Sequence, residues 1–76
     1  MELIEINQKI MLGKPVIKGT RITVEQIISL LSQDISIDEI LVEYKGLEKA
    51  HILACLQYAE NLLEKTTTFD LDKIAS

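Results

Sequence analysis

The chain has 76 residues, a net charge of −4 and a single cysteine, Cys55. This length allows one domain, a lone cysteine excludes an internal disulfide framework, and no segment approaches the ~20 apolar residues of a membrane span. We therefore expect a soluble, cytoplasmic protein with no membrane partner. Because 47% of this short chain is hydrophobic, we also expect apolar surface to be buried between copies, most simply in a homodimer.

Charge is distributed unevenly along the chain. Residues 1–24 have a net charge of +2, whereas residues 25–76 have a net charge of −6. An acidic chain is disfavoured as an autonomous nucleic-acid binder, because phosphate neutralisation supplies most non-specific affinity. A local positive patch in the N-terminal third is still compatible with DNA contact.

The N-terminal residues predict a strand and a hairpin. Apolar and polar residues alternate over residues 2–7, which indicates a short strand with one buried face, formed by Leu3, Ile4 and Ile6. Residues 10–12 are an apolar connector that fits no pattern. Residues 13–24, GKPVIKGTRITV, predict a β-hairpin, because the turn at residues 18–21 contains a glycine. The β-branched residues that favour extended chain on its two sides are Val16, Ile17 and Ile22.

Two short helices are expected next, each with a capping box. Thr23 and Gln26 form the pattern Thr-x-x-Gln at the start of the first helix, and Ser36 and Glu39 form Ser-x-x-Glu at the start of the second. Apolar residues follow at helical spacing. They are Val24, Ile27, Ile28 and Leu31 in the first helix, and Ile37, Ile40, Leu41 and Tyr44 in the second.

A third helix is predicted from about residue 48 to residue 64. An apolar stripe keeps the 3.6-residue period over three turns. It consists of Ile52, Cys55, Leu56, Ala59, Leu62 and Leu63. Threonines at positions 66–68 disfavour helix, so we expect the tail, residues 66–76, to be frayed or to order against an apolar surface.

Several apolar residues lie off these stripes and are candidates for binding a partner. An apolar surface that does not face the core commonly marks an interface. The candidates in the helices are Leu30, Val42, Leu53 and Tyr58, and those in the tail are Phe69, Leu71 and Ile74.

The second and third helices, joined by the short turn at residues 45–47, are typical of a helix-turn-helix. In that motif the second helix enters the major groove by its N-terminal part. The same arrangement also occurs in proteins that never contact DNA, and Glu48 would face phosphates with the wrong sign. The candidate DNA-binding residues, including those of the hairpin, are Lys14, Lys18, Arg21, Lys45, Lys49 and His51.

The sequence indicates no enzymatic site, cofactor or metal. A phosphate-binding loop needs lysine after its last glycine, whereas here Lys18 precedes Gly19. His51 and Cys55 lie on one helix face, but two ligands are too few for a structural zinc. Cys55 also lies within the apolar stripe, so we expect it to be a buried small hydrophobe.

Arg21 allows two interpretations that the sequence leaves open. It is the only arginine, and it lies directly after a tight turn and two residues before a helix cap. It could form a structural salt bridge, to Glu25 or to an acid of a neighbouring chain. It could equally bind a phosphate or a partner, for which the planar guanidinium is well suited.

Three segments together resemble the "domain of unknown function 433" family: GKPVIKGTRITV at 13–24, ILVEYKGL at 40–47 and ILACLQYA at 52–59. The resemblance covers residues 3 to about 64. It implies a mainly α fold in residues 1–65, with a homeodomain-like three-helix core (a helix-turn-helix) preceded by a short strand and a β-hairpin. The chain differs from the family pattern in having Lys45 instead of proline in the turn. It also has Glu48 and His51 where the family has threonine and an acid, so we expect the capping box of the third helix to be lost.

The family resemblance also suggests a function. Some members are similar to VapB-type antitoxins, which pair with a toxin of PIN-like nuclease fold. The resemblance therefore implies an antitoxin-like homodimer that inhibits such a nuclease and represses its own operon by binding operator DNA. Two alternatives are a stand-alone dimeric DNA-binding regulator and a purely structural interaction module.

Overall fold

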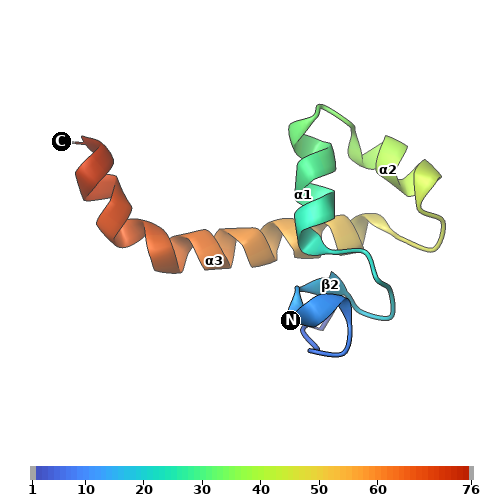
Figure 1. The fold of residues 1–76 in the computed structure, drawn as a ribbon. Coiled ribbons are helices and arrows are strands. Elements are labelled where there is room, and N and C mark those ends of the chain that lie inside the picture. The colour runs from blue at the N-terminus through green and yellow to red at the C-terminus, as the bar shows by residue number, and fades with distance from the viewer. Residues whose placement is uncertain (1, 76) are drawn as a thin grey trace.

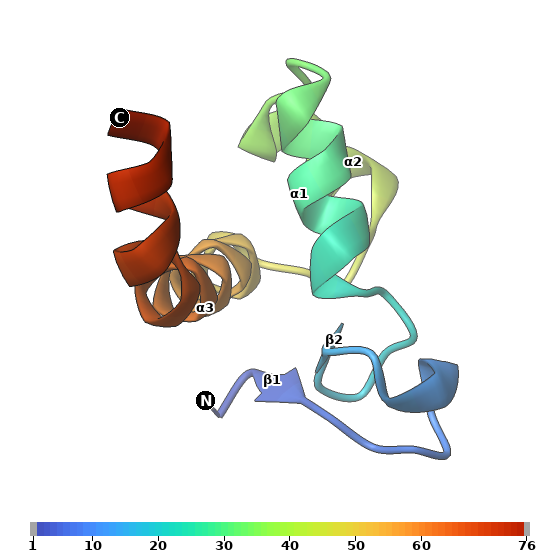
Figure 2. The same ribbon diagram turned by 60° about the vertical axis from the view of Figure 1, so that its left-hand side comes forward.

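The computed structural model describes the backbone of residues 2–75 and the side chains of residues 2–65. Within these residues the protein is mainly helical, with one two-stranded antiparallel sheet. The two shorter helices lie over the N-terminal part of the third, which continues beyond them and changes direction in its C-terminal part (Figures 1 and 2). The elements in chain order are β1 (Ile4–Glu5), the 3₁₀ helix η1 (Met11–Gly13), β2 (Val16–Ile17), α1 (Val24–Ser32), α2 (Ile37–Glu43) and α3 (Lys49–Ala75).

β1 is shorter than the alternating pattern predicts. It pairs with β2, so that Ile4 lies opposite Ile17 and Glu5 lies opposite Val16. Ile4 is buried, but Ile6 is 60% exposed, so the prediction that Ile6 shares the buried face is wrong. In this register the next residue of the partner strand is a proline, which has no N–H to donate, and the ladder stops there.

The predicted turn of the hairpin at residues 18–21 is present, but the prediction of a second strand after it is wrong. The Ile17 N–H donates to the Ile22 carbonyl, and the Thr20 N–H donates to the Ile17 carbonyl, both at 2.9 Å. The Ile22 N–H donates instead to the Thr20 hydroxyl at 3.0 Å. The returning chain therefore forms only a single bridge, between Val16 and Thr23, because Thr23 already caps the helix.

The first predicted capping box is half formed. The Thr23 hydroxyl accepts a hydrogen bond from the Gln26 N–H at 3.0 Å, as predicted. The Gln26 side chain does not return to Thr23, because its amide donates to the Tyr44 hydroxyl at 2.7 Å. Gln26 therefore connects the first turn of α1 to the residue that ends α2.

The second predicted capping box is confirmed. The Ser36 hydroxyl accepts from the Glu39 N–H at 3.1 Å, and the Glu39 carboxylate accepts from the Ser36 N–H at 3.0 Å. Hydrogen bonding with Ser36 lowers the pKa of the Glu39 carboxyl. The backbone N–H of Ser36 makes the larger contribution and its hydroxyl the smaller one. α2 thus begins where the sequence predicts, because all groups of a cap lie within four residues of one another.

The core is aliphatic and draws on every main element. Its fully buried side chains come from β2, α1, α2 and α3, and they are Val16, Ile17, Ile27, Ile40, Ile52 and Cys55. The predicted stripes are confirmed at these positions. Burial of this kind stabilises the fold by about 25 cal/mol for each Å² of apolar surface removed from water.

The stripe predicted for the third helix is wrong beyond Cys55. Leu56 is 39% exposed, and Leu62 and Leu63 are also exposed, because α1 and α2 cover only the first part of α3 (Figure 1). The predicted end near residue 64 is also too early, since α3 extends to Ala75. Threonine costs a helix less than about 0.7 kcal/mol per residue, and residues 65–75 contain neither glycine nor proline.

The cap of α1 gives a direct test of this fold. Thr23→Ala should lower the free energy of unfolding by about 1 kcal/mol, because the Gln26 N–H at the buried start of α1 loses its acceptor. Thr23→Ser keeps the hydroxyl and should lose much less. Urea denaturation followed by circular dichroism measures both, and equal losses in the two variants would contradict the role of the hydroxyl.

Candidate interaction surfaces

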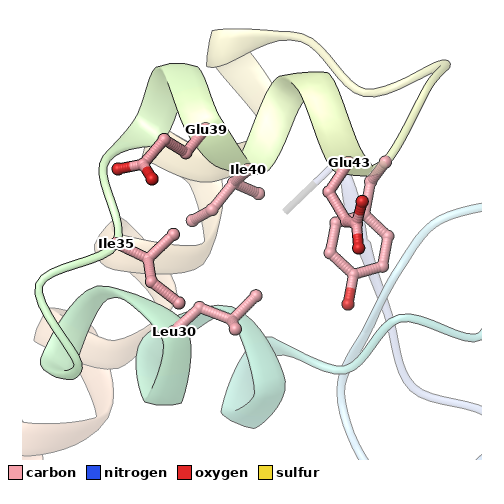
Figure 3. A pocket seen from close by; sticks show the side chains of 6 residues that line it. Leu30, Ile35, Glu39, Ile40 and Glu43 are labelled. Atoms are coloured by element: carbon pink, nitrogen blue, oxygen red, sulfur yellow. The ribbon is translucent and has the colours of Figure 1, made fainter.

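α1, α2 and the turn between them enclose an open hollow of about 280 Å³. Figure 3 shows the aliphatic side chains of Leu30, Ile35 and Ile40 pointing toward one another in it, with Glu39 and Glu43 at its edge on α2. The ring of Tyr44 completes the lining. Small-molecule sites commonly enclose ~300–1,000 Å³, so this open hollow lies at the small end of that range and also has room for a side chain. We call it the socket.

The chain around the socket carries charge of one sign. Residues 22–44 contain five acidic residues and no lysine or arginine, whereas residues 7–21 contain four basic residues and no acid. All nine side chains are exposed. The acids are Glu25, Asp34, Asp38, Glu39 and Glu43, and the bases are Lys9, Lys14, Lys18 and Arg21. The N-terminal loops and the α1–α2 pair therefore have opposite charge.

The connector that the sequence left unassigned forms a compact loop at residues 7–14. The Ile10 N–H donates to the Asn7 carbonyl at 2.9 Å, and the Lys14 N–H donates to the Met11 carbonyl at 3.1 Å. A Cβ on Gly13 would lie 2.9 Å from the Gln8 amide, so this side of the loop is closely packed. The loop is thus held by its own hydrogen bonds rather than by the core.

This loop presents an exposed leucine in an unfavourable backbone conformation. Leu12 is 88% exposed, and both Met11 and Leu12 have left-handed backbone, with φ of 50° and 58°. A side chain in this conformation costs about 1–2 kcal/mol per residue. The sequence signal for this loop is an apolar run, too short for a helix and flanked by Lys9 and Lys14.

Of the candidate DNA-binding residues in the N-terminal region, Lys14 forms an ion pair, whereas Lys18 and Arg21 form none within the described part of the chain. The Lys14 ammonium lies 3.1 Å from the Glu25 carboxylate, and both side chains are exposed. Glu25 is therefore the partner of Lys14 and not of Arg21. Lys18 and Arg21 are exposed, and Arg21 has no hydrogen bond or ion pair with the side chains described in residues 2–65.

The other candidate DNA-binding residues lie at the turn between α2 and α3. Lys45 and Lys49 are exposed there, and His51 is half-buried. The Nδ1 atom of His51 accepts a hydrogen bond from the Glu48 N–H at 2.9 Å, which requires an unprotonated Nδ1. The expected loss of the cap is therefore only partial, because the imidazole performs the part of a capping-box carboxylate.

The candidate partner-binding residues of the helices divide into two groups. Val42 on α2 is 75% exposed and Leu53 on α3 is 48% exposed. Leu30 and Tyr58 are half-buried and pack against the core. Leu56 lies beside Leu53 along a shallow depression on α3. The side chains of the tail candidates Phe69, Leu71 and Ile74 lie outside the described part of the structure.

Neither a metal site nor a reactive thiol is present among the described residues. No three histidine, cysteine or carboxylate side chains in that part of the chain are grouped to hold a metal ion. Cys55 is fully buried, and this burial raises the pKa of its thiol to about 11. No helix within the described residues has both the length and the apolar composition needed to cross a bilayer.

Comparison with known proteins finds one family. The family described as "protein of unknown function (DUF433)" matches residues 4–59. No curated protein and no solved structure matches the chain.

The burial of Cys55 predicts its chemical behaviour. At pH 8 about one thiol in a thousand is ionised when the pKa is about 11, so iodoacetamide should alkylate the folded protein very slowly. The same reagent in 8 M urea should modify Cys55 within minutes, at a rate ordinary for cysteine. Intact mass spectrometry follows both reactions, and fast labelling without urea would contradict the buried position.

Proposed function

The chain belongs to the DUF433 family, and we propose that it is a non-enzymatic protein-binding module, the antitoxin-like component of a toxin–antitoxin pair. In this proposal α2, the turn and α3 form a homeodomain-like helix-turn-helix core. The partner is a PIN-like nuclease, as the resemblance to VapB-type antitoxins suggests, and the protein acts as a homodimer.

The length and exposed face of α3 are the observation that supports this proposal best. α3 has 27 residues, while its fully buried side chains, Ile52 and Cys55, lie in its first two turns. Leu53 and Leu56 are exposed one turn apart, on the flank of this buried face. Large apolar side chains exposed together on one helix face are typical of a surface that another protein covers.

Charge beside these leucines suits a nuclease partner. Glu60 lines the same depression as Leu53 and Leu56, and Glu64 follows one turn later. A nuclease site must attract phosphates and is therefore positively charged, so an acidic apolar helix complements it. Covering the site inhibits the nuclease without any chemistry from this chain.

Substitutions on this face test the proposal. When the protein is co-expressed with a PIN-like nuclease encoded beside its gene, it should co-purify with the nuclease and restore growth. Leu53→Asp with Leu56→Asp should weaken binding by about 30-fold or more, the effect of losing a central apolar contact.

The control is Ile6→Asp, which introduces one aspartate, against the two of the double variant, at an apolar residue exposed elsewhere. It should leave both co-purification and growth unchanged. Absence of co-purification and of growth rescue by the unsubstituted protein would contradict the antitoxin-like function, and equal effects of the two substitutions would contradict the role of α3.

DNA binding is a second candidate, favoured by the four basic residues and the absence of acids at residues 7–21. Lys18 and Arg21 are exposed and available to phosphates. Lys45 and Lys49 add positive charge at the α2–α3 turn, whereas the acids of α2 oppose approach to a phosphate backbone. Two copies in a dimer would bind half-sites about one helical turn apart.

A gel-shift titration on the promoter of its own gene tests this candidate. Affinity should fall steeply with salt, and Arg21→Ala should reduce the salt slope by about one ion, because one phosphate contact is lost. Lys65→Ala, a lysine exposed on α3, serves as the control of equal charge. Binding that is absent or independent of salt would exclude the DNA-binding function.

A further inference from the structure

The loop at residues 7–14 offers an exposed apolar side chain, and the socket offers an open hollow. Leu12 is the most exposed large apolar side chain of the described residues, and it stands on a loop braced by hydrogen bonds. The socket has room for a side chain between the aliphatic groups of Leu30, Ile35 and Ile40, with carboxylates at its edge. An exposed leucine is unfavourable in water and is stabilised by burial against such aliphatic groups.

Their charges are complementary as well. Lys9 belongs to the same loop as Leu12 and is exposed, while Glu39 and Glu43 stand at the edge of the socket. Lys18 and Arg21 add positive charge in the neighbouring turn, and no acid lies within residues 7–21. Opposite potentials of this kind favour encounter and fix the orientation of two surfaces.

The strained backbone of the loop gives a third indication. Leu12 has a φ of 58°, a backbone conformation that glycine adopts without strain and leucine does not. Strained conformations of this kind occur mainly at functional sites. The strain here serves no contact with the core, since Leu12 touches solvent over most of its surface. The loop presents an apolar side chain outward.

We infer that Leu12 of one copy of this chain inserts into the socket of a second copy. Lys9 then lies near Glu39 and Glu43 of the other copy. The occupant is a second copy because one chain carries both halves of the contact, and the two halves have opposite charge. The inference rests on the homodimer of the proposed function and supplies its interface.

The positions of the two sites allow the assembly to close. The loop adjoins the start of α1 through the ion pair between Lys14 and Glu25, and the socket includes Leu30, near the other end of α1. In the inferred dimer two antiparallel copies each place Leu12 in the socket of the other. Such a reciprocal contact has two-fold symmetry and does not propagate into a filament.

Sedimentation equilibrium over a wide range of protein concentration tests this contact. The unsubstituted protein should form a dimer. Leu12→Gly should raise the dissociation constant by roughly 10- to 100-fold, the effect of losing one buried leucine. Glycine accepts the left-handed backbone at this position, so the melting temperature of the variant monomer should be unchanged or higher.

Two charge-reversal variants, one at the socket and one away from it, isolate the electrostatic contribution to dimer affinity. Glu43→Lys at the edge of the socket should weaken the dimer by about fivefold at about 50 mM salt, and the difference should shrink at high salt. Glu64→Lys on α3 makes the same change of net charge away from the socket, and it should have no effect. Equal weakening by both would indicate general repulsion and overturn the contact.

Mixing the two variants provides a second test. The Leu12→Gly chain keeps an intact socket, and the Glu43→Lys chain keeps an intact Leu12. The mixed dimer has one intact contact and one contact that carries both changes, so its dissociation constant should be lower than that of the Leu12→Gly dimer. If the Leu12→Gly chain associates with the Glu43→Lys chain no better than with itself, the reciprocal arrangement is overturned.

The remaining outcomes separate this inference from the proposed function. A dimer that both variants leave intact overturns the Leu12 contact but not the homodimer. An unsubstituted protein that stays monomeric overturns both. If Leu12→Gly keeps the dimer but loses a co-purifying nuclease, Leu12 contacts the nuclease and not a second copy, and the inference is also overturned. Loss of nuclease binding through Leu53 alone leaves the Leu12 contact standing.

Discussion

Four isoleucines hold this small protein together, one from each main element. Ile17 of β2, Ile27 of α1, Ile40 of α2 and Ile52 of α3 are almost completely buried in a single cluster. Replacing a buried aliphatic residue by alanine commonly costs 2–5 kcal/mol, a large fraction of the stability of a domain this size. The positions of the helices relative to the sheet depend on this one cluster.

So small a core leaves much apolar surface outside it. A domain of this length buries only about two-thirds of its unfolded surface, and the structure leaves exposed leucines at two separate places, on η1 and on α3. The surplus is therefore organised as two distinct contact areas, which allows one chain to engage two partners at once.

The parts of the fold that depend on neighbouring residues could be predicted from the sequence. Ser36 and Glu39 cap α2 because both bonds form within four residues, and Cys55 was expected to be buried from its place in the stripe. Tertiary packing decided the rest. Gln26 bonds Tyr44, 18 residues away, and Leu56 is exposed because no element covers it. The left-handed backbone at Leu12 had no local signal, since leucine does not favour it.

The weak attachment of α2 has a consequence for motion. This helix has seven residues and one buried side chain, Ile40, whereas α1 and α3 each bury at least two. Its other link to α1 is the exposed hydrogen bond between Gln26 and Tyr44. Local opening should therefore begin at α2, with its amides exchanging with solvent before those of α1. Since α2 forms one wall of the socket, any occupant binds only the closed state and slows this opening.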